Sequence, residues 1–244
     1  GLAALHPPLG ESPTPMPDDP GESSIIATLL SGRPAPDGFQ PRLDAGDDVA
    51  VLPDGTAVGT DLMVEGVHWD DRLSPEDVGW KLVAVNASDL GATGARPAWA
   101  TLDLALPRPV DGAWVDAFAR GLHAGLAAHG VRLVGGDTSR SPGPRFASLT
   151  MGGPAPRPVR RDGARPGDPI WVSGTLGDAA AGFHHGGDGL AWLRRPHPPV
   201  GLGCALADAG LASAMMDLSD GLARDLGRLC AASGCAAQVD ASAL

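Results

Sequence analysis

The 244-residue sequence is poor in basic residues, and lysine above all, which excludes several kinds of phosphate and nucleic-acid binding. Its formal net charge is −11 and no cluster of Lys and Arg forms a basic face, so DNA, RNA and anionic membranes are not expected as main partners. Lys81, the only lysine, follows Gly79-Trp80 and has no Gly-Lys-Ser/Thr context, which excludes a Walker-type phosphate loop. Any phosphate chemistry must therefore use metal ions, arginine and backbone amides.

Long apolar runs and paired cysteines are also missing. No apolar run approaches the length of a membrane span. Cys204, Cys230 and Cys235 match neither a zinc pattern nor a disulfide framework, and a reducing cytoplasm is the simplest setting for them. There is no Gly-x-Ser-x-Gly elbow and no Ser/His/Asp set, so we expect no covalent nucleophile.

Periodicity and turn residues predict an α+β protein in two lobes. Residues 1–21 are rich in proline and are predicted to be a disordered tail. Ser74-Pro75-Glu76-Asp77 has the pattern of a capping box that opens a helix. In the first lobe, residues 22–152, we expect helices at 22–30, 74–90 and 111–129, and strands at 49–52, 56–63, 99–106, 131–134 and 145–151.

Proline and glycine cluster at residues 152–158, which predicts a linker before a second lobe over residues 153–244. A glycine-rich turn, Ser173–Asp178, precedes an alanine-rich helix and is typical of a phosphate loop, although such turns also occur without ligands. His184-His185 and Gly186–Gly189 are predicted to be loop. Around them we expect a strand at 169–173, helices near 201–210 and 222–233, and a last strand at 237–241.

What the sequence has in abundance is aspartate beside Gly, Ser and Thr. Hard divalent cations such as Mg²⁺ prefer oxygen ligands and usually share their site with substrate phosphates. Five such segments, most of them flanked by predicted buried strand or helix, indicate a Mg²⁺–nucleotide site assembled from distant parts of the chain. The seven aspartates are Asp47, Asp48, Asp61, Asp89, Asp137, Asp217 and Asp220.

Three of these segments have an ordinary structural explanation when each is taken alone. Asp47-Asp48 suits a turn, because Asp bonds its own backbone. Asp89 suits a polar cluster at the end of a helix. Ser219 or Asp220 suits a helix N-cap, although capping and metal binding are compatible.

The other two segments point more directly to a ligand. Asp61 lies in a strand-like run where Asp is unfavourable, so its carboxylate needs a partner, and a metal ion fits best. Gly135-Gly136-Asp137 follows a predicted buried strand, and the two glycines would let a ligand approach the backbone closely.

Taken together, the segments resemble the thiamine-monophosphate kinase family over residues 22–244, in the right order and with compatible spacing. The resemblance implies the two-lobed fold of aminoimidazole-ribonucleotide synthetase, with an N-terminal α/β dimerisation lobe and a truncated C-terminal α+β lobe. It is carried by the motifs Gly46-Asp47-Asp48, Thr60–His68, Lys81–Leu90, Gly135–Thr138, Gly163–Asp168, Ser173–Asp178 and Met216–Leu222.

The resemblance also implies a reaction and a site. The γ-phosphoryl group of ATP would pass directly to thiamine monophosphate in a homodimeric enzyme with several Mg²⁺ ions. His68, which in isolation is more typical of a polar surface residue, would contact the thiamine phosphate, and Asp47 would support the metal cluster from behind its ligands. The implied metal ligands are Asp48, Thr60, Asp61, Asp89, Asp137, Asp217 and Asp220, and the implied ATP contacts are Gly136, Asp137, Arg161 and Ser219.

The sequence departs from the family at two places. Gly59 stands where the family often has Ser or Thr, so one hydroxyl ligand is lost. The family also continues well past Leu244 with residues that hold the thiamine ring. The alternatives are therefore a fragment that binds Mg-ATP and dimerises without catalysis, or another ATP-using enzyme of the superfamily. A calcium-binding acidic protein is excluded, because no twelve-residue loop of alternating oxygen ligands occurs.

Overall fold

The computed structural model describes residues 21–34 and 36–240, so residues 1–20 of the predicted tail lie outside the described part. The chain divides into two units, residues 1–39 and 40–244. The first unit holds α1 (Glu22–Leu30), which has the predicted bounds. All of the remaining elements belong to the second unit.

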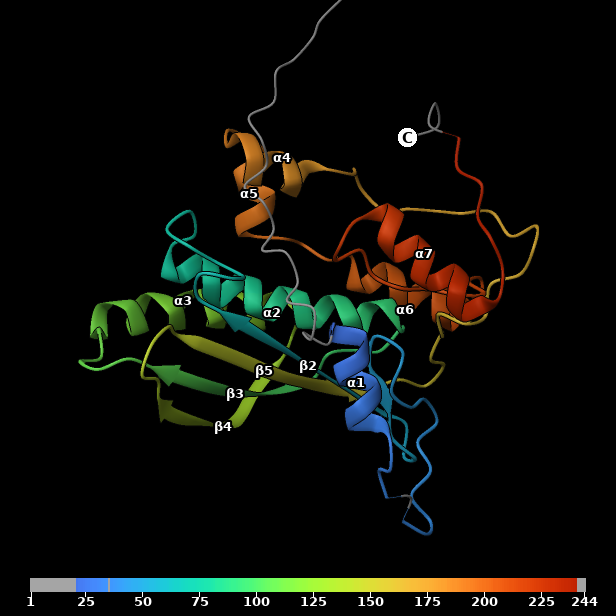
Figure 1. The fold of residues 1–244 in the computed structure, drawn as a ribbon, viewed down its shortest axis with the longest axis horizontal. Coiled ribbons are helices and arrows are strands. Elements are labelled where there is room, and N and C mark those ends of the chain that lie inside the picture. The colour runs from blue at the N-terminus through green and yellow to red at the C-terminus, as the bar shows by residue number, and fades with distance from the viewer. Residues whose placement is uncertain (1–20, 35, 241–244) are drawn as a thin grey trace, which may run out of the picture. The chain divides into compact units, whose positions relative to one another are not determined.

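A five-stranded sheet forms the centre of the second unit (Figure 1). Its strands follow the order β1-β2-β5-β3-β4, and only the β3–β4 pair is parallel. Four of the strands lie close to their predicted positions. The strands are β1 (Ala50–Val51), β2 (Thr56–Val64), β3 (Trp99–Leu106), β4 (Arg132–Arg140) and β5 (Phe146–Pro154).

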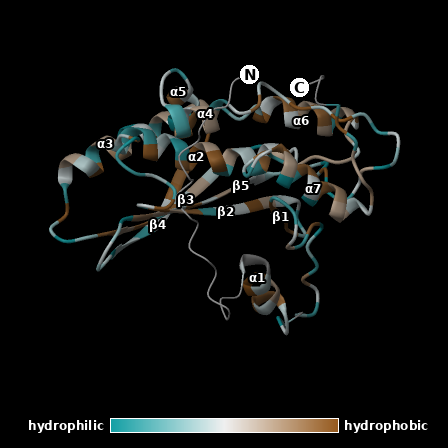
Figure 2. Ribbon diagram, turned by 45° about the horizontal axis from the view of Figure 1, so that its top comes forward, coloured by the Kyte–Doolittle hydropathy of each residue, from teal (hydrophilic) through white to brown (hydrophobic). Residues whose placement is uncertain are grey.

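Two helices, α2 (Pro75–Ala92) and α3 (Gly112–Ala128), cover one face of this sheet (Figures 1 and 2). The predicted capping box is present: the Ser74 hydroxyl accepts from the Asp77 N–H at 3.2 Å, and the Asp77 carboxylate accepts from the Ser74 N–H at 3.2 Å. Asp111 caps α3 by accepting from the Trp114 N–H at 3.1 Å. Both helix starts are thus fixed by local sequence.

The core lies between these helices and the inner face of the sheet. Along β2 the side chains alternate, so Ala57 and Met63 are buried on the helix side while Leu62 is 53% exposed on the other. The largest fully buried side chains include Phe118, Leu82 and Leu149, from α3, α2 and β5. Apolar burial of this kind is the main force that holds the two layers together.

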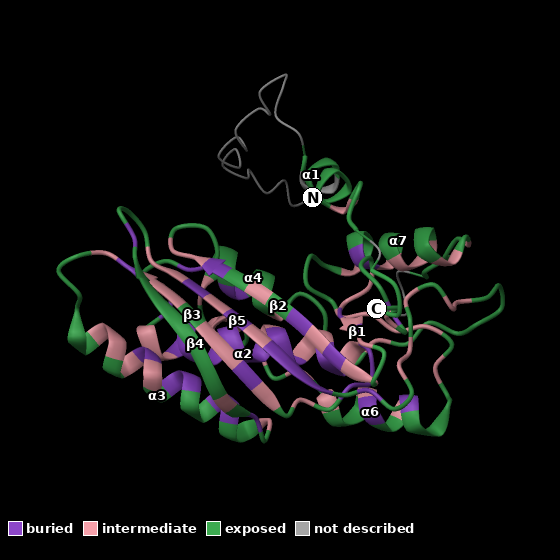
Figure 3. Cartoon of the chain, turned by 90° about the horizontal axis from the view of Figure 1, so that it is seen from below, coloured by how far each residue is buried: buried purple, intermediate pink, exposed green. Residues whose placement is uncertain are grey.

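The fourth strand differs from its prediction in length and in burial. It was expected as a short buried strand at 131–134 that ends before Gly135, but β4 continues to Arg140 and is mostly exposed (Figure 3). The reason is its place at the edge of the sheet, where only β3 pairs with it. Val134, for example, is 58% exposed.

The predicted linker at 152–158 is wrong in its first part, because Gly152 and Gly153 belong to β5. A Cβ on Gly152 would lie 2.3 Å from the Trp99 ring, and one on Gly153 would lie 1.9 Å from the Arg96 carbonyl oxygen. These glycines therefore permit close packing inside the sheet layer rather than flexibility between lobes.

Beyond β5 the described chain is helical and irregular. The helices are α4 (Asp178–His185), α5 (Gly189–Arg194), α6 (Val200–Ala209) and α7 (Leu222–Ser233). The predicted helices at 201–210 and 222–233 are confirmed. His184-His185, expected as loop, ends α4, and Gly189, expected in the same loop, begins α5, which was not predicted.

The strands predicted at 169–173 and 237–241 are not formed in the described residues, and residue 241 lies outside them. All described ladders involve residues 43–154, so neither segment has a strand beside it to accept its backbone hydrogen bonds. Trp171, in the first segment, is 88% exposed. No helix within the described residues has both the length and the apolar character needed to cross a membrane.

The contact between α2 and α3 depends on glycine. A Cβ on Gly121 would lie 1.7 Å from the Glu76 carbonyl oxygen, whereas one on Gly112, in the same helix, would meet nothing within 4 Å. Gly121→Ala should therefore lower the free energy of unfolding by about 2 kcal/mol or more, through forced separation of the two helices. Urea denaturation should show this loss, and Gly112→Ala should not; equal stability of the two variants would contradict the packing argument.

Candidate functional site

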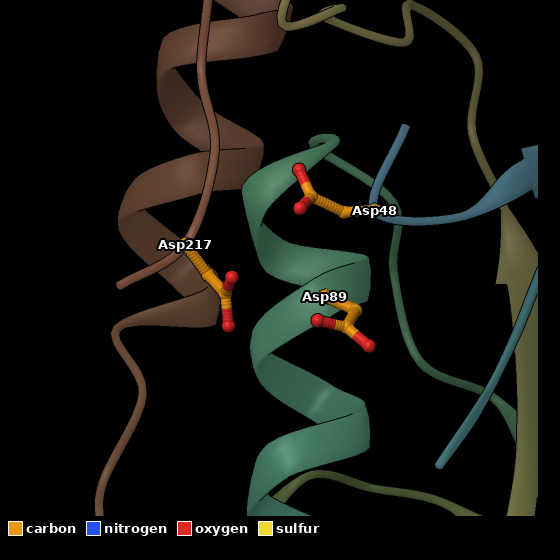
Figure 4. A group of neighbouring side chains, drawn as sticks. All are labelled: Asp48, Asp89 and Asp217. Atoms are coloured by element: carbon orange, nitrogen blue, oxygen red, sulfur yellow. The ribbon is translucent and has the colours of Figure 1, made fainter. Parts of the chain in front are cut away.

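Three aspartates from distant parts of the sequence meet beside α2 (Figure 4). Asp48 precedes β1, Asp89 lies in the last turns of α2, and Asp217 lies between α6 and α7. One carboxylate oxygen from each lies within 4.8 Å of the others, a spacing at which a single cation could contact all three. We call these three residues the aspartate cluster.

Asp61 extends this cluster from the sheet. It lies on β2 at the position that alternation places on the helix side, together with Ala57 and Met63. The carboxyl groups of Asp61 and Asp89 lie close enough to interact with each other and to share a proton. Burial raises the pKa of both side chains, and for Asp89 the charge of Asp61 raises it further. Asp61 thus lies against a second carboxylate, and the metal ion predicted as its partner stays a prediction.

The other two members of the cluster are also hard to ionise without a cation. Burial raises the pKa of Asp48 to about 7, although the neighbouring Arg161 guanidinium acts in the opposite direction. Burial raises the pKa of Asp217 as well, while a hydrogen bond from the Ser88 hydroxyl at 2.9 Å lowers it. A bound divalent ion would offset the cost of burying these negative charges and displace the protons.

Arg161 is the cation that lies against the cluster. Its guanidinium donates to Asp48 Oδ1 at 2.6 Å, and its backbone N–H donates to Asp47 Oδ2 at 3.1 Å. The side chains of Asp47 and Asp48 are 5% and 4% exposed, and that of Arg161 is 18% exposed. Asp47 therefore supports Asp48 by holding the Arg161 segment in place.

The residues present fit a hard divalent cation. All of the donors in the cluster are carboxylate oxygens, the ligands that Mg²⁺ prefers. In addition, Asp48 Oδ2 is buried without a hydrogen-bond partner, as is Nε of Arg161. A buried, unpartnered carboxylate oxygen beside two further carboxylates is a favourable position for a metal–oxygen bond.

The segment from Asp217 to Gly221 is held by other hydrogen bonds than the predicted helix N-cap. Neither Ser219 nor Asp220 caps α7: the N-cap is Gly221, without any side-chain bond. The carboxylate of Asp225, which is fully buried, accepts the N–H groups of this segment instead. Asp220 is exposed and paired with Arg228 at 2.7 Å, outside the aspartate cluster.

Asp225 was not predicted from the sequence. The signal that could have identified it is its place in the first turn of α7, where a carboxylate meets free backbone N–H groups.

The predicted ligand Thr60 and the neighbouring Gly59, both on β2, offer no side-chain oxygen to the cluster. The Thr60 hydroxyl lies on the opposite face from Asp61, where it donates to the Leu149 carbonyl oxygen at 3.2 Å and accepts from Thr150. Gly59 has no room for the missing hydroxyl, because a Cβ there would lie 2.9 Å from Val49 Cγ1. At these two positions, only a backbone carbonyl oxygen could act as a metal ligand.

Asp137 and Gly136 lie on β4, which the strand order separates from β2 by β5 and β3. Three strand spacings amount to about 14 Å, so within one chain Asp137 does not join the cluster. Its backbone N–H donates to Asp103 on β3 at 2.9 Å, and its side chain is exposed. A Cβ on Gly136 would lie 1.8 Å from the Leu102 carbonyl oxygen, so this glycine is already required for strand pairing.

His68 lines a cavity of about 140 Å³ together with Arg72 and Phe183. Its Nδ1 accepts from the Val64 N–H at 2.9 Å, which leaves Nε2 as the ring nitrogen able to meet a ligand. The Arg72 guanidinium lies 3.9 Å from the centre of the Phe183 ring and also pairs with Asp70. The cavity thus combines a cation, an aromatic face and a hydrogen-bonding imidazole.

The predicted phosphate loop at Ser173–Asp178 is only partly present. It leads into α4 as expected, and Gly177 has the left-handed conformation (φ 91°) that a glycine allows. No strand precedes it in the described residues. The Thr175 hydroxyl donates to the Asp178 carboxylate, so these two polar side chains are hydrogen-bonded to each other without a ligand.

Comparison with known proteins connects this geometry to a family. Residues 46–154 match the model of the AIR synthase related protein N-terminal domain, and residues 165–244 match that of the C-terminal domain. The thiamine-monophosphate kinases of Salmonella typhimurium and Escherichia coli are 42% and 40% identical over 92% of this chain. The chain spans 73% of the length of each.

Solved structures agree with the sequence matches. Thiamine monophosphate kinase from Aquifex aeolicus superposes with a TM-score of 0.77 at 31% identity, over 90% of this chain and 74% of the other. A structure of AaThiL complexed with AMPPCP and TMP gives a TM-score of 0.74 at 32% identity, over 88% of this chain and 71% of the other.

The raised pKa of Asp48 allows a test of the site through protein stability, which does not depend on catalysis. Its folded-state pKa of about 7 lies above the ordinary value of 3.8, so ionisation of Asp48 destabilises the metal-free fold as the pH rises through that window. The upper limit is about 1.4 kcal/mol per pH unit. With metal ions removed by a chelator, Asp48→Asn should therefore become more stable relative to the wild type as the pH rises from acidic to neutral.

Thermal melts of both proteins across this pH range, with chelator and then with excess Mg²⁺, would measure the effect. Mg²⁺ should restore the wild type near neutral pH and should have little effect on Asp48→Asn. Parallel pH profiles in chelator, or equal stabilisation by Mg²⁺, would contradict the cation site.

Proposed function

This chain belongs to the AIR synthase related family and, within it, to the thiamine-monophosphate kinases, and from that premise we propose that it transfers the γ-phosphoryl group of ATP to thiamine monophosphate, giving thiamine diphosphate. The observation that carries the proposal is the meeting of Asp48, Asp89 and Asp217 from three distant segments. ATP and thiamine monophosphate are the substrates, in keeping with the AMPPCP and TMP bound to AaThiL.

We propose Mg²⁺ as the metal of this enzyme, held by Asp48, Asp61, Asp89 and Asp217, with Asp220 joining when Arg228 releases it. Bound Mg²⁺ would neutralise the charge on the transferring phosphoryl group and on the leaving oxygen. Phosphoryl transfer depends mostly on positioning and charge stabilisation, so a chain with one lysine and no phosphate-loop lysine can rely on ions held by aspartate.

The role of Arg161 follows from its position beside the cluster. Its planar fork suits phosphate oxygens, and its salt bridge to Asp48 keeps it within reach of any nucleotide bound there. We propose that a metal ion replaces Arg161 as the partner of Asp48 and frees the guanidinium for the ATP phosphates. Ser219, next to Asp220, is proposed as a second ATP contact.

Gly136 and Asp137 remain part of the proposed nucleotide site, and Thr60 remains part of the metal site through its backbone. Because β4 is an exposed edge strand of one chain, we propose that Asp137 acts only in a homodimer joined through the open face of the sheet. Two exposed apolar side chains, Leu62 on β2 and Val134 on β4, support such an interface. Sedimentation of the purified chain as a monomer at micromolar concentration would contradict this assembly.

Two further assignments complete the proposal. The boundary between the lobes, expected at residue 152, is placed just after β5 ends at Pro154, which is supported by the end of one family domain at residue 154 and the start of the next at residue 165. A cytoplasmic location is supported by Cys204, Cys230 and Cys235, which are all free thiols.

Formation of thiamine diphosphate from ATP and thiamine monophosphate tests the reaction. The wild type should form product only with Mg²⁺. Asp89→Asn should lower kcat/KM by about 100-fold or more, because it removes a ligand of the cation proposed to stabilise the charge on the transferring phosphoryl group. Asp116→Asn, an exposed change on α3, is the matched control and should leave the rate unchanged. Mg²⁺-dependent ATP binding without product would favour the non-catalytic alternative, and metal-independent turnover would contradict the mechanism.

His68 is proposed to bind the phosphate of thiamine monophosphate through Nε2. His68→Ala should raise KM for thiamine monophosphate by about tenfold, the effect of losing one hydrogen bond to a charged group, while KM for ATP changes little. His123→Ala, an exposed change on α3, provides the control in the same steady-state assay. A larger rise in KM for ATP would assign His68 to the other substrate.

A further inference from the structure

One buried carboxylate next to the aspartate cluster has no part in the proposed chemistry. Asp225, in the first turn of α7, is 0% exposed. Its Oδ2 accepts three consecutive backbone N–H groups, from Ser219 at 3.0 Å, Asp220 at 2.9 Å and Gly221 at 3.0 Å. Its Oδ1 accepts from the Arg228 guanidinium at 3.1 Å.

These bonds hold the segment that presents the cluster. Asp217 lies two residues before the first bonded N–H, and its carboxylate is held from the other side by the Ser88 hydroxyl of α2. The next bonded N–H belongs to Asp220, whose carboxylate is paired with Arg228. Asp225 therefore fixes the backbone between two proposed metal ligands, Asp217 and Asp220, and it also bonds the Arg228 guanidinium that pairs with Asp220 in this structure.

Helix capping alone does not account for this arrangement. A cap needs one acceptor for the first free N–H groups of the helix itself. Here two of the three N–H groups, those of Ser219 and Asp220, lie before the N-cap residue Gly221 and outside α7. The bonds to a charged acceptor are also the strong kind, roughly twice as strong as neutral ones.

We propose that Asp225 is a positioning residue for the metal–nucleotide site: it holds the Asp217–Gly221 segment in the conformation that presents Asp217 to Asp48 and Asp89. This inference rests on the proposed function, because it assigns a role relative to that same site. Asp225 is not itself expected to touch the metal ion or the substrates.

The matched comparison is Asp225→Asn against Asp77→Asn. An Asn at 225 keeps one oxygen for the N–H groups, but it loses the charge and turns an NH₂ group toward Arg228. Asp77 is likewise a mostly buried carboxylate that accepts from a segment before a helix, at Ser74, and pairs with an arginine, Arg195. It lies twelve residues before Asp89 on α2, about 18 Å away along the helix.

Mn²⁺ binding to the purified full chain, followed by the electron paramagnetic resonance signal of free Mn²⁺, gives a readout independent of turnover. Asp225→Asn should weaken Mn²⁺ binding by about tenfold, as supporting groups behind metal ligands do. It should also raise KM for Mg-ATP more than KM for thiamine monophosphate. Asp77→Asn should lose thermal stability but keep the wild-type affinity for Mn²⁺.

Wild-type affinity for Mn²⁺ in folded Asp225→Asn, or equal weakening in Asp77→Asn, would overturn the positioning role. Failure of the wild type itself to bind Mn²⁺ would instead overturn the proposed function. Hydrogen exchange of the wild-type chain decides the point even where the variant does not fold. The amides of Ser219, Asp220 and Gly221 should be protected without metal, and rapid exchange at all three would refute the proposal.

Discussion

The burial of four neighbouring carboxylates around the last turns of α2 is the constraint on which the site depends. Asp61, Asp89, Asp48 and Asp217 are all held in surroundings that raise their pKa values, and Arg161 is the cation bonded directly to one of them. Without a metal ion, shared protons and Arg161 offset the charge. The fold thus keeps four carboxylates in a strained electrostatic arrangement that a divalent cation relieves, and a cation bound there can attract phosphate in turn.

The same helix connects the site to the rest of the molecule. The first turn of α2 carries the capping box and meets α3 at Gly121, its middle fills the core with Leu82, and its end carries Ser88 and Asp89. A helix fixed at its start and packed along its length presents its last side chains with little freedom. Asp48 and Asp217, in contrast, come from irregular segments that need supporting bonds, such as those of Asp47 and Asp225.

Much of the fold could be predicted from the sequence, because the signals were local. The capping box at Ser74 and the periodicity of the first lobe fixed α2, α3 and most strands to within a few residues. The segments whose structure was predicted wrongly depend on spatial neighbours that a sequence pattern does not reveal. The apolar run at 169–173 had no strand beside it, Gly152 and Gly153 met Trp99 and Arg96 instead of forming a linker, and β4 was an edge strand.

For the site, the composition of the segments predicted an aspartate cluster, and Asp48, Asp89 and Asp217 came together, with Asp61 beside Asp89. Strand alternation could have placed Thr60 on the opposite face, and only the strand order separates Asp137 from the others. The most direct measurement is a crystal structure with Mn²⁺ and a non-hydrolysable ATP analogue, in which anomalous scattering locates the metal. The account predicts a peak bound by Asp48, Asp89 and Asp217, with Arg161 turned toward the phosphates. A peak elsewhere, with the Arg161–Asp48 pair intact, would contradict it.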